Sequence, residues 1–140
     1  MAVEVKFSIS GLDQLQSSTN KIIKDLTSQK TALLLTQAKL VQARIKEKAP
    51  VGPPTDKKPG LLKSATFATA LPETTTSCAV AFAGIREGRA PHGHLVEYGH
   101  AGPQPAPPHP FVRPAWDELK DTVTNNIAKG LGEIIEGSVD

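Results

Sequence analysis

The chain carries histidine, cysteine and serine side chains of the kinds that bind metals or act as nucleophiles. Its four histidines fall within eighteen residues: His92, His94, His100 and His109. A zinc site needs three or four such ligands converging tetrahedrally. These histidines lie among prolines and glycines without regular ligand spacing, and Cys78 is the only cysteine. We therefore predict no metal site and no cofactor. A small metal-dependent hydrolase or nuclease using the histidine cluster is the alternative.

Nucleophilic catalysis has weaker support. Ser64, Ser77 and Cys78 lie in stretches typical of strands, and none sits in the Gly-x-Ser-x-Gly turn that exposes a catalytic serine. The glycine-containing segment 84–89 lacks the Lys-Ser/Thr pair of a phosphate-binding loop. We therefore predict that the chain is not an enzyme.

Length and composition set the class of protein. A chain of 140 residues is expected to form one domain, residues 1–140. The formal net charge of +2 is too small to indicate nucleic-acid binding by bulk electrostatics. A single cysteine fits a protein made in a reducing cytoplasm. Neither a signal peptide nor an apolar run of about 20 residues is recognisable, so we expect no membrane contact.

The first half of the chain is predicted to be a strand followed by helices. Residues 1–9 alternate apolar and polar side chains, which is typical of a half-buried strand. Residues 11–48 are predicted to be helical, because apolar residues recur every three or four positions. The stripes before and after residues 27–30 are out of phase, which indicates two helices or one kinked helix. Residues 50–60 form a proline-rich loop.

The second half is predicted to contain strands, an arm and a helix. Residues 61–98 are expected to form strands: a hairpin up to residue 85 and a short strand at His94–Tyr98. A proline-rich arm follows at 99–112, then a helix at 113–136 with Pro114 in its first turn. The fold class is α+β, a small antiparallel sheet of about four strands packed against a long N-terminal helix or helix pair and a C-terminal helix.

The arm is the most unusual feature, because six of the twelve prolines lie between Pro103 and Pro114. Such stiffening suits an element that fits against other subunits. Glu97, just before it, is expected to be a solvent-facing strand residue or to pair with an arginine of a neighbouring subunit. Phe111 and Trp116 are expected to pack in the core. A basic cluster near the 50–60 loop is expected to be solvated, or to face an acidic partner or DNA: Lys46, Lys48, Lys57, Lys58 and Lys63.

Four short motifs, in order, resemble one family. They are Ala-Pro-Val at 49–51, Gly-Leu-Leu-Lys-Ser at 60–64, Leu-Val-Glu-Tyr-Gly at 95–99, and Pro-His-Pro-Phe-Val-Arg-Pro-Ala at 108–115. Together they resemble the HK97-type tail-completion (neck) proteins of long-tailed phages, over roughly residues 30–120. The last motif is fairly specific, whereas each of the others alone is weak. The loop after Val51 is longer than is usual in that family.

The resemblance implies a structural virion protein at the head–tail junction, assembled in the host cytoplasm. The resemblance implies a tail-completion or tail-terminator subunit in a hexameric ring, which caps the tail tube and allows head joining. The implied partners are further copies of the chain, tail-tube and head-side connector proteins, and DNA passing through without specific binding. We expect Phe111→Ala and Glu97→Ala to impair joining more than folding. The candidate interface residues are Glu97, Tyr98, Gly99, His109, Pro110, Phe111, Arg113, Pro114, Lys57 and Lys58.

Overall fold

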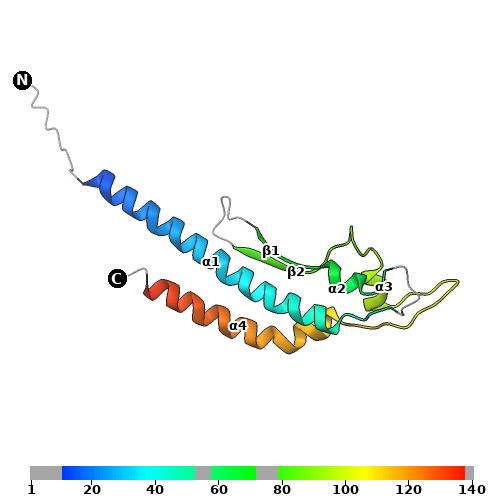
Figure 1. Cartoon of the computed structure of the whole chain (residues 1–140). Coiled ribbons are helices and arrows are strands. Elements are labelled where there is room, and N and C mark those ends of the chain that lie inside the picture. Colours follow the sequence, from blue (N-terminus) through cyan, green and yellow to red (C-terminus); the bar gives the residue numbers. More distant parts are fainter. Residues whose placement is uncertain (1–10, 53–57, 72–78, 138–140) are drawn as a thin grey trace, which may run out of the picture.

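The computed structural model describes residues 11–52, 58–71 and 79–137. It shows an α+β fold in which a long N-terminal helix and a C-terminal helix pack with a two-stranded antiparallel sheet (Figure 1). The elements are α1 (Leu12–Lys48), α2 (Leu61–Ala65), β1 (Thr66–Leu71), β2 (Val80–Ile85), α3 (Gly93–Tyr98) and α4 (Val112–Glu136). No described helix is both long and apolar enough to cross a membrane.

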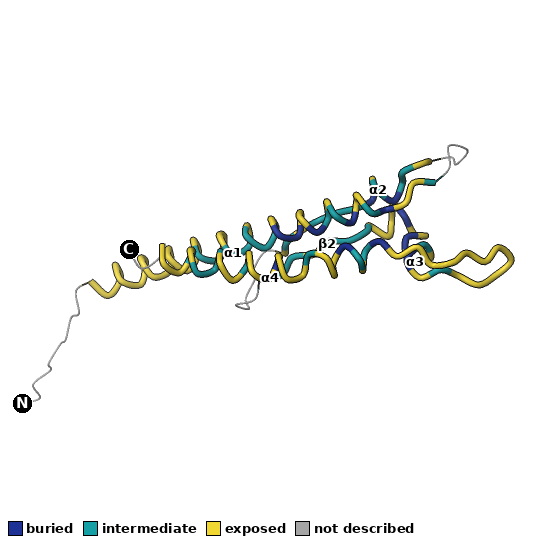
Figure 2. Tube along the Cα trace, turned by 90° about the horizontal axis from the view of Figure 1, so that it is seen from below, coloured by how far each residue is buried: buried dark blue, intermediate teal, exposed yellow. Residues whose placement is uncertain are grey.

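Helix α1 is the central element. It packs against both strands and against α4, which lies on its other side (Figure 1). Only its second half contributes to the core, with Val41 and Ile45 buried. At its N-terminal end, residues 11–25 are exposed and extend beyond the packed part of the protein (Figure 2). The sequence correctly predicted helix over this region, but the two-helix alternative is wrong. The stripes differ in phase because only the second one faces the sheet and α4.

The sheet is a hairpin whose two strands pair in register from Thr66 opposite Ile85 to Leu71 opposite Val80. Ala83 and Ile85 pack against the core, whereas Phe82 is exposed on the other face. One small and one large aliphatic side chain of β2 thus face the helices. The hairpin pairing confirms the sequence prediction, but its turn lies outside the described residues.

The core is small and sits where the C-terminal half of α1 meets α2 and the first turns of α4. Its largest fully buried side chains are Ile45 and Phe111. The other buried members are mostly small: Val41, Ala49, Leu62, Ala65, Ala90, Ala115 and Val123. Because most of these side chains are small, the backbones of the elements can approach closely.

Two predicted strands are helices instead. Residues 61–65 form α2, where the Ser64 amide donates to the Gly60 carbonyl at 3.1 Å. Residues 93–98 form α3, and the Val96 amide donates to the His92 carbonyl at 3.1 Å. These bonds span four residues, so the local period is helical rather than two. With residues 1–9 outside the described part, the described sheet has two strands rather than about four.

Candidate assembly interface

Residues 99–110, which we call the proline finger, form a closed projection beyond α3 (Figure 1). His100 and Ala106 exchange two backbone hydrogen bonds, each 3.1 Å long. The His109 amide then donates to the Val96 carbonyl at 2.8 Å, which fixes the returning end to α3. All side chains from His100 to Pro110 are exposed. Backbone hydrogen bonds therefore hold the two sides of the finger together, while its side chains remain exposed to solvent.

Gly99 makes the closure of the finger possible. Its φ of +71° lies in the region that residues with a side chain rarely adopt. A Cβ at this position would lie 2.8 Å from both the Ala106 oxygen and the Pro108 nitrogen. Since both contacts are to backbone, neither neighbour can move aside cheaply. Glycine is thus required where the two sides of the finger meet.

Glu97 caps the N-terminus of α4. Its Oε2 accepts hydrogen bonds from the amides of Phe111 (2.7 Å) and Val112 (2.9 Å), and its Oε1 accepts from the Arg113 amide (3.0 Å). The first amides of a helix have no intrahelical partner, and they carry the positive end of its dipole. A carboxylate supplied from α3 satisfies three of them, so the two ends of the finger are tied together.

The environment of Glu97 differs from the sequence expectation. The residue is only 7% exposed, so the solvent-facing strand position is wrong. Burial acts to raise the pKa of its carboxyl. The amides of Phe111, Val112 and Arg113, together with the Arg113 charge, outweigh it and leave the pKa below its usual value. Glu97 is therefore a buried anion held by its own chain.

Phe111 and Trp116 separate in the structure. Phe111 is 1% exposed and joins the core, which confirms its predicted packing role. Trp116 is 47% exposed, so its predicted place in the core is wrong. It lies one turn further along α4 and lines two surface hollows. A helical stripe shows which residues share a face, but not whether another element covers that face.

An exposed aromatic and cationic surface lies beside the finger. Tyr98 is 67% exposed, and the Arg113 guanidinium carbon lies 5.8 Å from the centre of its ring, a cation–π arrangement. Both residues and Trp116 line one hollow of about 430 Å³ between α3 and α4. Tyrosine, tryptophan and arginine are the residue types that most often dominate binding energy at protein interfaces.

The remaining predicted residues are spread over the surface. His109, Pro110 and Lys58 are exposed, Pro114 is partly buried in the first turn of α4, and Lys57 lies outside the described residues. All four histidines are exposed. Within residues 11–52, 58–71 and 79–137, no three His, Cys, Asp or Glu side chains are grouped so that they could hold a metal ion.

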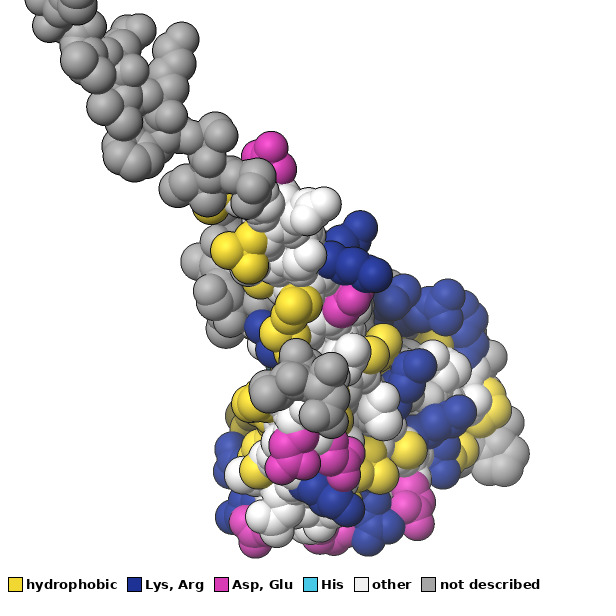
Figure 3. Space-filling view, turned by 90° about the vertical axis from the view of Figure 1, so that its left-hand side faces the viewer, with side chains coloured by type: hydrophobic (Ala, Val, Ile, Leu, Met, Phe, Trp, Pro, Cys, Tyr) yellow, Lys and Arg dark blue, Asp and Glu magenta, His cyan; other side chains and the backbone are white. Residues whose placement is uncertain are grey.

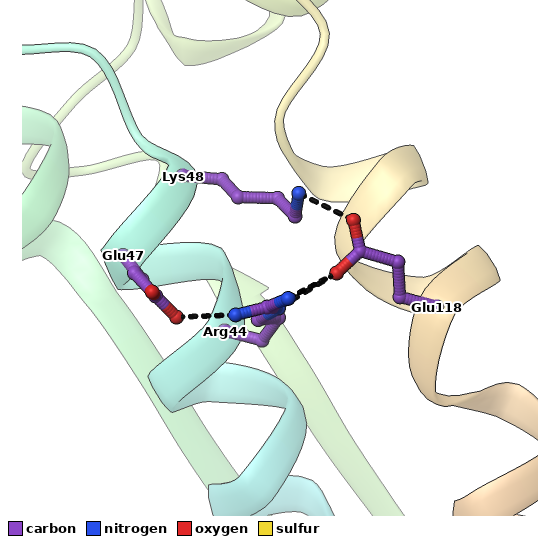
Figure 4. Close-up of polar contacts among 4 residues, drawn as sticks. All are labelled: Arg44, Glu47, Lys48 and Glu118. Atoms are coloured by element: carbon purple, nitrogen blue, oxygen red, sulfur yellow. Dashed lines mark hydrogen bonds and ion pairs between the residues drawn. The ribbon is translucent and has the colours of Figure 1, made fainter.

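One charged network was missed from the sequence (Figure 4). Glu118 on α4 contacts Arg44 and Lys48 on α1, each at 2.5 Å, and Arg44 also contacts Glu47 at 2.7 Å. Hydrogen bonds and charge from Lys48 and Arg44 lower the pKa of the Glu118 carboxyl. Only the Arg44–Glu47 spacing is local, so no sequence signal connects Glu118 to its partners. The network fixes α4 beside the end of α1.

Comparison of the chain with protein-family models, curated proteins and solved structures finds no match.

Proposed function

We propose that this chain is a structural subunit of the head–tail junction of a long-tailed phage. In this proposal it is a tail-completion or tail-terminator subunit, which caps the tail tube and allows head joining. The proposal rests on the resemblance of its motifs and on the construction of the proline finger. It involves no reaction and no cofactor.

The contact between Glu97 and the start of α4 is the observation that carries the proposal. Two of the resembling motifs, Glu-Tyr-Gly at 97–99 and His-Pro-Phe-Val-Arg-Pro at 109–114, lie on either side of the finger. The carboxylate of the first accepts hydrogen bonds from three amides of the second. The two motifs therefore contact each other directly, and their contact fixes the base of the exposed finger.

A projection of this kind suits docking between subunits. Its prolines and backbone bonds limit the freedom that it loses on binding, and pre-organised elements bind at lower entropic cost. Tyr98 and Arg113 offer contact area at its base. We expect the finger and this surface to touch a tail-tube protein, a connector protein or a neighbouring copy in a hexameric ring. DNA would pass through that ring without specific binding.

The first experiment removes the gene from the genome that encodes it. Joined particles, free heads and free tails are then counted by electron microscopy, with and without the chain supplied from a plasmid. We expect free heads and tails without it and joined particles with it. Normal joined particles in its absence would overturn the proposal. Stoichiometric metal and a chelator-sensitive hydrolysis by the purified chain would instead favour the histidine-cluster hydrolase.

The second experiment tests the finger itself. Replacing Pro105, Pro107 and Pro108 together by glycine makes it more flexible without touching the core, because all three are exposed. Pro91→Gly, at an exposed position outside the finger, is the matched control. We expect the triple variant to lose joining while it still folds, with a melting temperature lowered only by the added freedom of the unfolded chain, and the control to keep joining. Equal joining by the two variants would show that the finger does not dock.

A further inference from the structure

An apolar groove runs between β2 and α4, with α1 as its floor. It has a volume of about 360 Å³. Its lining includes Leu34, Val41, Val80, Trp116, Val123 and Ile127. Gln37 also lines it, and its Oε1 accepts a hydrogen bond from the Asn126 amide at 3.0 Å. Among the described residues no charged side chain lines the groove, so water inside it would find few hydrogen-bond partners.

The groove lies beside β2, on the side away from β1. Its lining includes Ala79, Val80, Ala81 and Ala83 but no residue of β1. Ala79, Ala81 and Ala83 alternate along the chain and share the helix-facing side of the strand, so the groove lies on that side of the sheet. On one edge β2 pairs with β1, and no other described backbone group bonds to it. Its sequence, VAFAGI, has no charge or proline of the kind that protects free edges.

The chain contains one segment whose pattern fits this place. Val3, Val5, Phe7 and Ile9 alternate with Glu4, Lys6 and Ser8. A strand of this kind, added to β2, would place four apolar side chains on the groove side and the polar ones in water. It would also enlarge a two-stranded sheet, and sheets of three or more strands are more stable.

That segment cannot reach the groove of its own subunit. The groove begins at Leu34, which lies 22 residues after Leu12 in α1 and hence about 33 Å along the helix. Val3, nine residues before Leu12, reaches at most about 31 Å even when the intervening chain is fully extended. Ile9, three residues before Leu12, reaches only about 10 Å. Seven residues therefore cannot lie along the edge of β2 while α1 stays helical from Leu12.

We infer that residues 3–9 of one copy of this chain add as a strand to the β2 edge of a second copy. Strand addition of this kind gives affinity through main-chain bonds and specificity through alternate side chains. Arm and groove are different surfaces, so the contact is head-to-tail and generates a ring when its rotation closes. The inference rests on the proposed function only for self-association, and not for a place in a virion.

The projecting part of α1 supports the same arrangement. Its apolar side chains, Leu12, Leu15, Ile22 and Ile23, are exposed along the helix that precedes the body. Viewed from the N-terminal end of α1, hydrophobic side chains gather on one side of this helix and lysines on another (Figure 3). If residues 3–9 bind a neighbouring copy, the N-terminal part of α1 lies close to that copy. The neighbour would then cover the exposed apolar side chains of α1 as well.

Disulfide trapping tests the inference. In the full chain with Cys78→Ser, one variant carries Phe7→Cys and a second carries Ala81→Cys. The two are mixed before mild oxidation. Val5→Cys replaces Phe7→Cys in a parallel mixture, since the register is free to differ by two. Opposite residues on neighbouring strands lie about 4.5–5.5 Å apart, within disulfide range. Lys6→Cys is the matched control, because its side chain points to the other face.

We expect the mixtures with Val5→Cys or Phe7→Cys to give a covalent species at twice the 14.8 kDa chain mass. Docking raises the effective concentration, so this species should exceed that of the Lys6→Cys control more than about tenfold. Sedimentation reports the assembly state of each sample. An oligomer without selective trapping overturns the arm exchange alone. A monomer at every concentration overturns both the exchange and the proposed ring. A further variant carries both Phe7→Cys and Ala81→Cys in one chain. A disulfide within that chain, without dimer, would show that the arm folds back and would overturn the exchange.

Discussion

Replacing Glu97 tests the cap on which the finger depends. Glu97→Gln keeps the size of the side chain but exchanges one acceptor oxygen for an NH₂ group facing helix amides. The carboxylate accepts bonds of 2.7, 2.9 and 3.0 Å, two of them at Oε2. A hydrogen bond to a buried charged group contributes about 1.5–3 kcal/mol, and a helix cap about 0.5–2 kcal/mol. We expect Glu97→Gln to lower the free energy of unfolding by about 1–3 kcal/mol.

Urea unfolding followed by circular dichroism measures this change. Glu97→Ala removes all three bonds and should cost about 2–4 kcal/mol, since one buried amide and two part-buried amides then lose their acceptor. Glu87→Gln is the matched control, because Glu87 is exposed in the loop after β2. It should stay within about 0.5 kcal/mol of the unchanged chain. A Glu97→Gln variant as stable as this control would refute the capping role.

The pH dependence gives a second measure of the same cap. The pKa of Glu97 is lowered in the folded protein from its ordinary value of 4.5. A lowered folded pKa stabilises the fold above the unfolded value, and this contribution is lost as pH falls through the folded value. Stability of the unchanged chain should therefore decrease below about pH 4.5, and Glu97→Gln should flatten that decrease. Parallel pH profiles for the two proteins would contradict the lowered pKa.

The burial of Glu97 and Phe111 also changes an expectation drawn from the sequence. Both residues act inside the subunit, so alanine at either position should reduce folding stability as well as joining. Tyr98, exposed and outside the core, is the better probe of docking. Tyr98→Ala should impair joining while the melting temperature stays unchanged.

Four further substitutions test the packing and the charged network. Gly132→Ala should stabilise α4 by up to about 1 kcal/mol, since nothing lies within 4 Å of the added Cβ. Gly130→Ala should not be stabilised in this way, because its added Cβ would lie 2.7 Å from Leu33 Cδ1 on α1. Equal urea midpoints for Gly130→Ala and Gly132→Ala would contradict this close contact between α1 and α4. Gly99→Ala should lower the free energy of unfolding by more than about 1 kcal/mol, which the urea midpoint measures. Amide hydrogen exchange in the finger should become faster. An unchanged midpoint would contradict the close contact of Gly99 with the Ala106 and Pro108 backbone. Glu118→Gln should slightly lower the free energy of unfolding, measured in urea at low salt, because it weakens an exposed ion-pair network. The difference should disappear at high salt, where exposed charges are screened, and a difference that salt does not change would contradict this prediction.

The sequence predicted the parts of the fold that local periodicity decides. The apolar stripe of α4 runs from Trp116 to Ile134, about five turns, and the helix extends from Val112 to Glu136, close to the predicted 113–136. The hairpin strands were also found. The segment at His94–Tyr98 was assigned wrongly, because five residues are too few to distinguish a period of two from one of 3.6. Its actual bonds depend on the turn at residues 89–93 that precedes it.

The candidate site was predicted by composition but not by geometry. Six clustered prolines indicated a stiff arm, and the arm is closed by bonds at His100 and Ala106. The role of Glu97 was missed, because its partners lie 14 to 16 residues away and are backbone amides rather than charged side chains. Almost every residue has a backbone amide, so residue types do not show which amides need an acceptor. The available signal was a glutamate shortly before a proline-rich loop and a helix with proline in its first turn.

The pairing of α1 with α4 governs the order in which the chain can fold. Gln37 bonds to Asn126 across 89 residues, and Arg44 bonds to Glu118 across 74. These contacts close a loop that contains the whole sheet and the finger, and long-range closure slows folding. During synthesis, α1 leaves the ribosome long before α4 exists, with its apolar stripe uncovered. The domain can therefore complete its core only after α4 has left the ribosome.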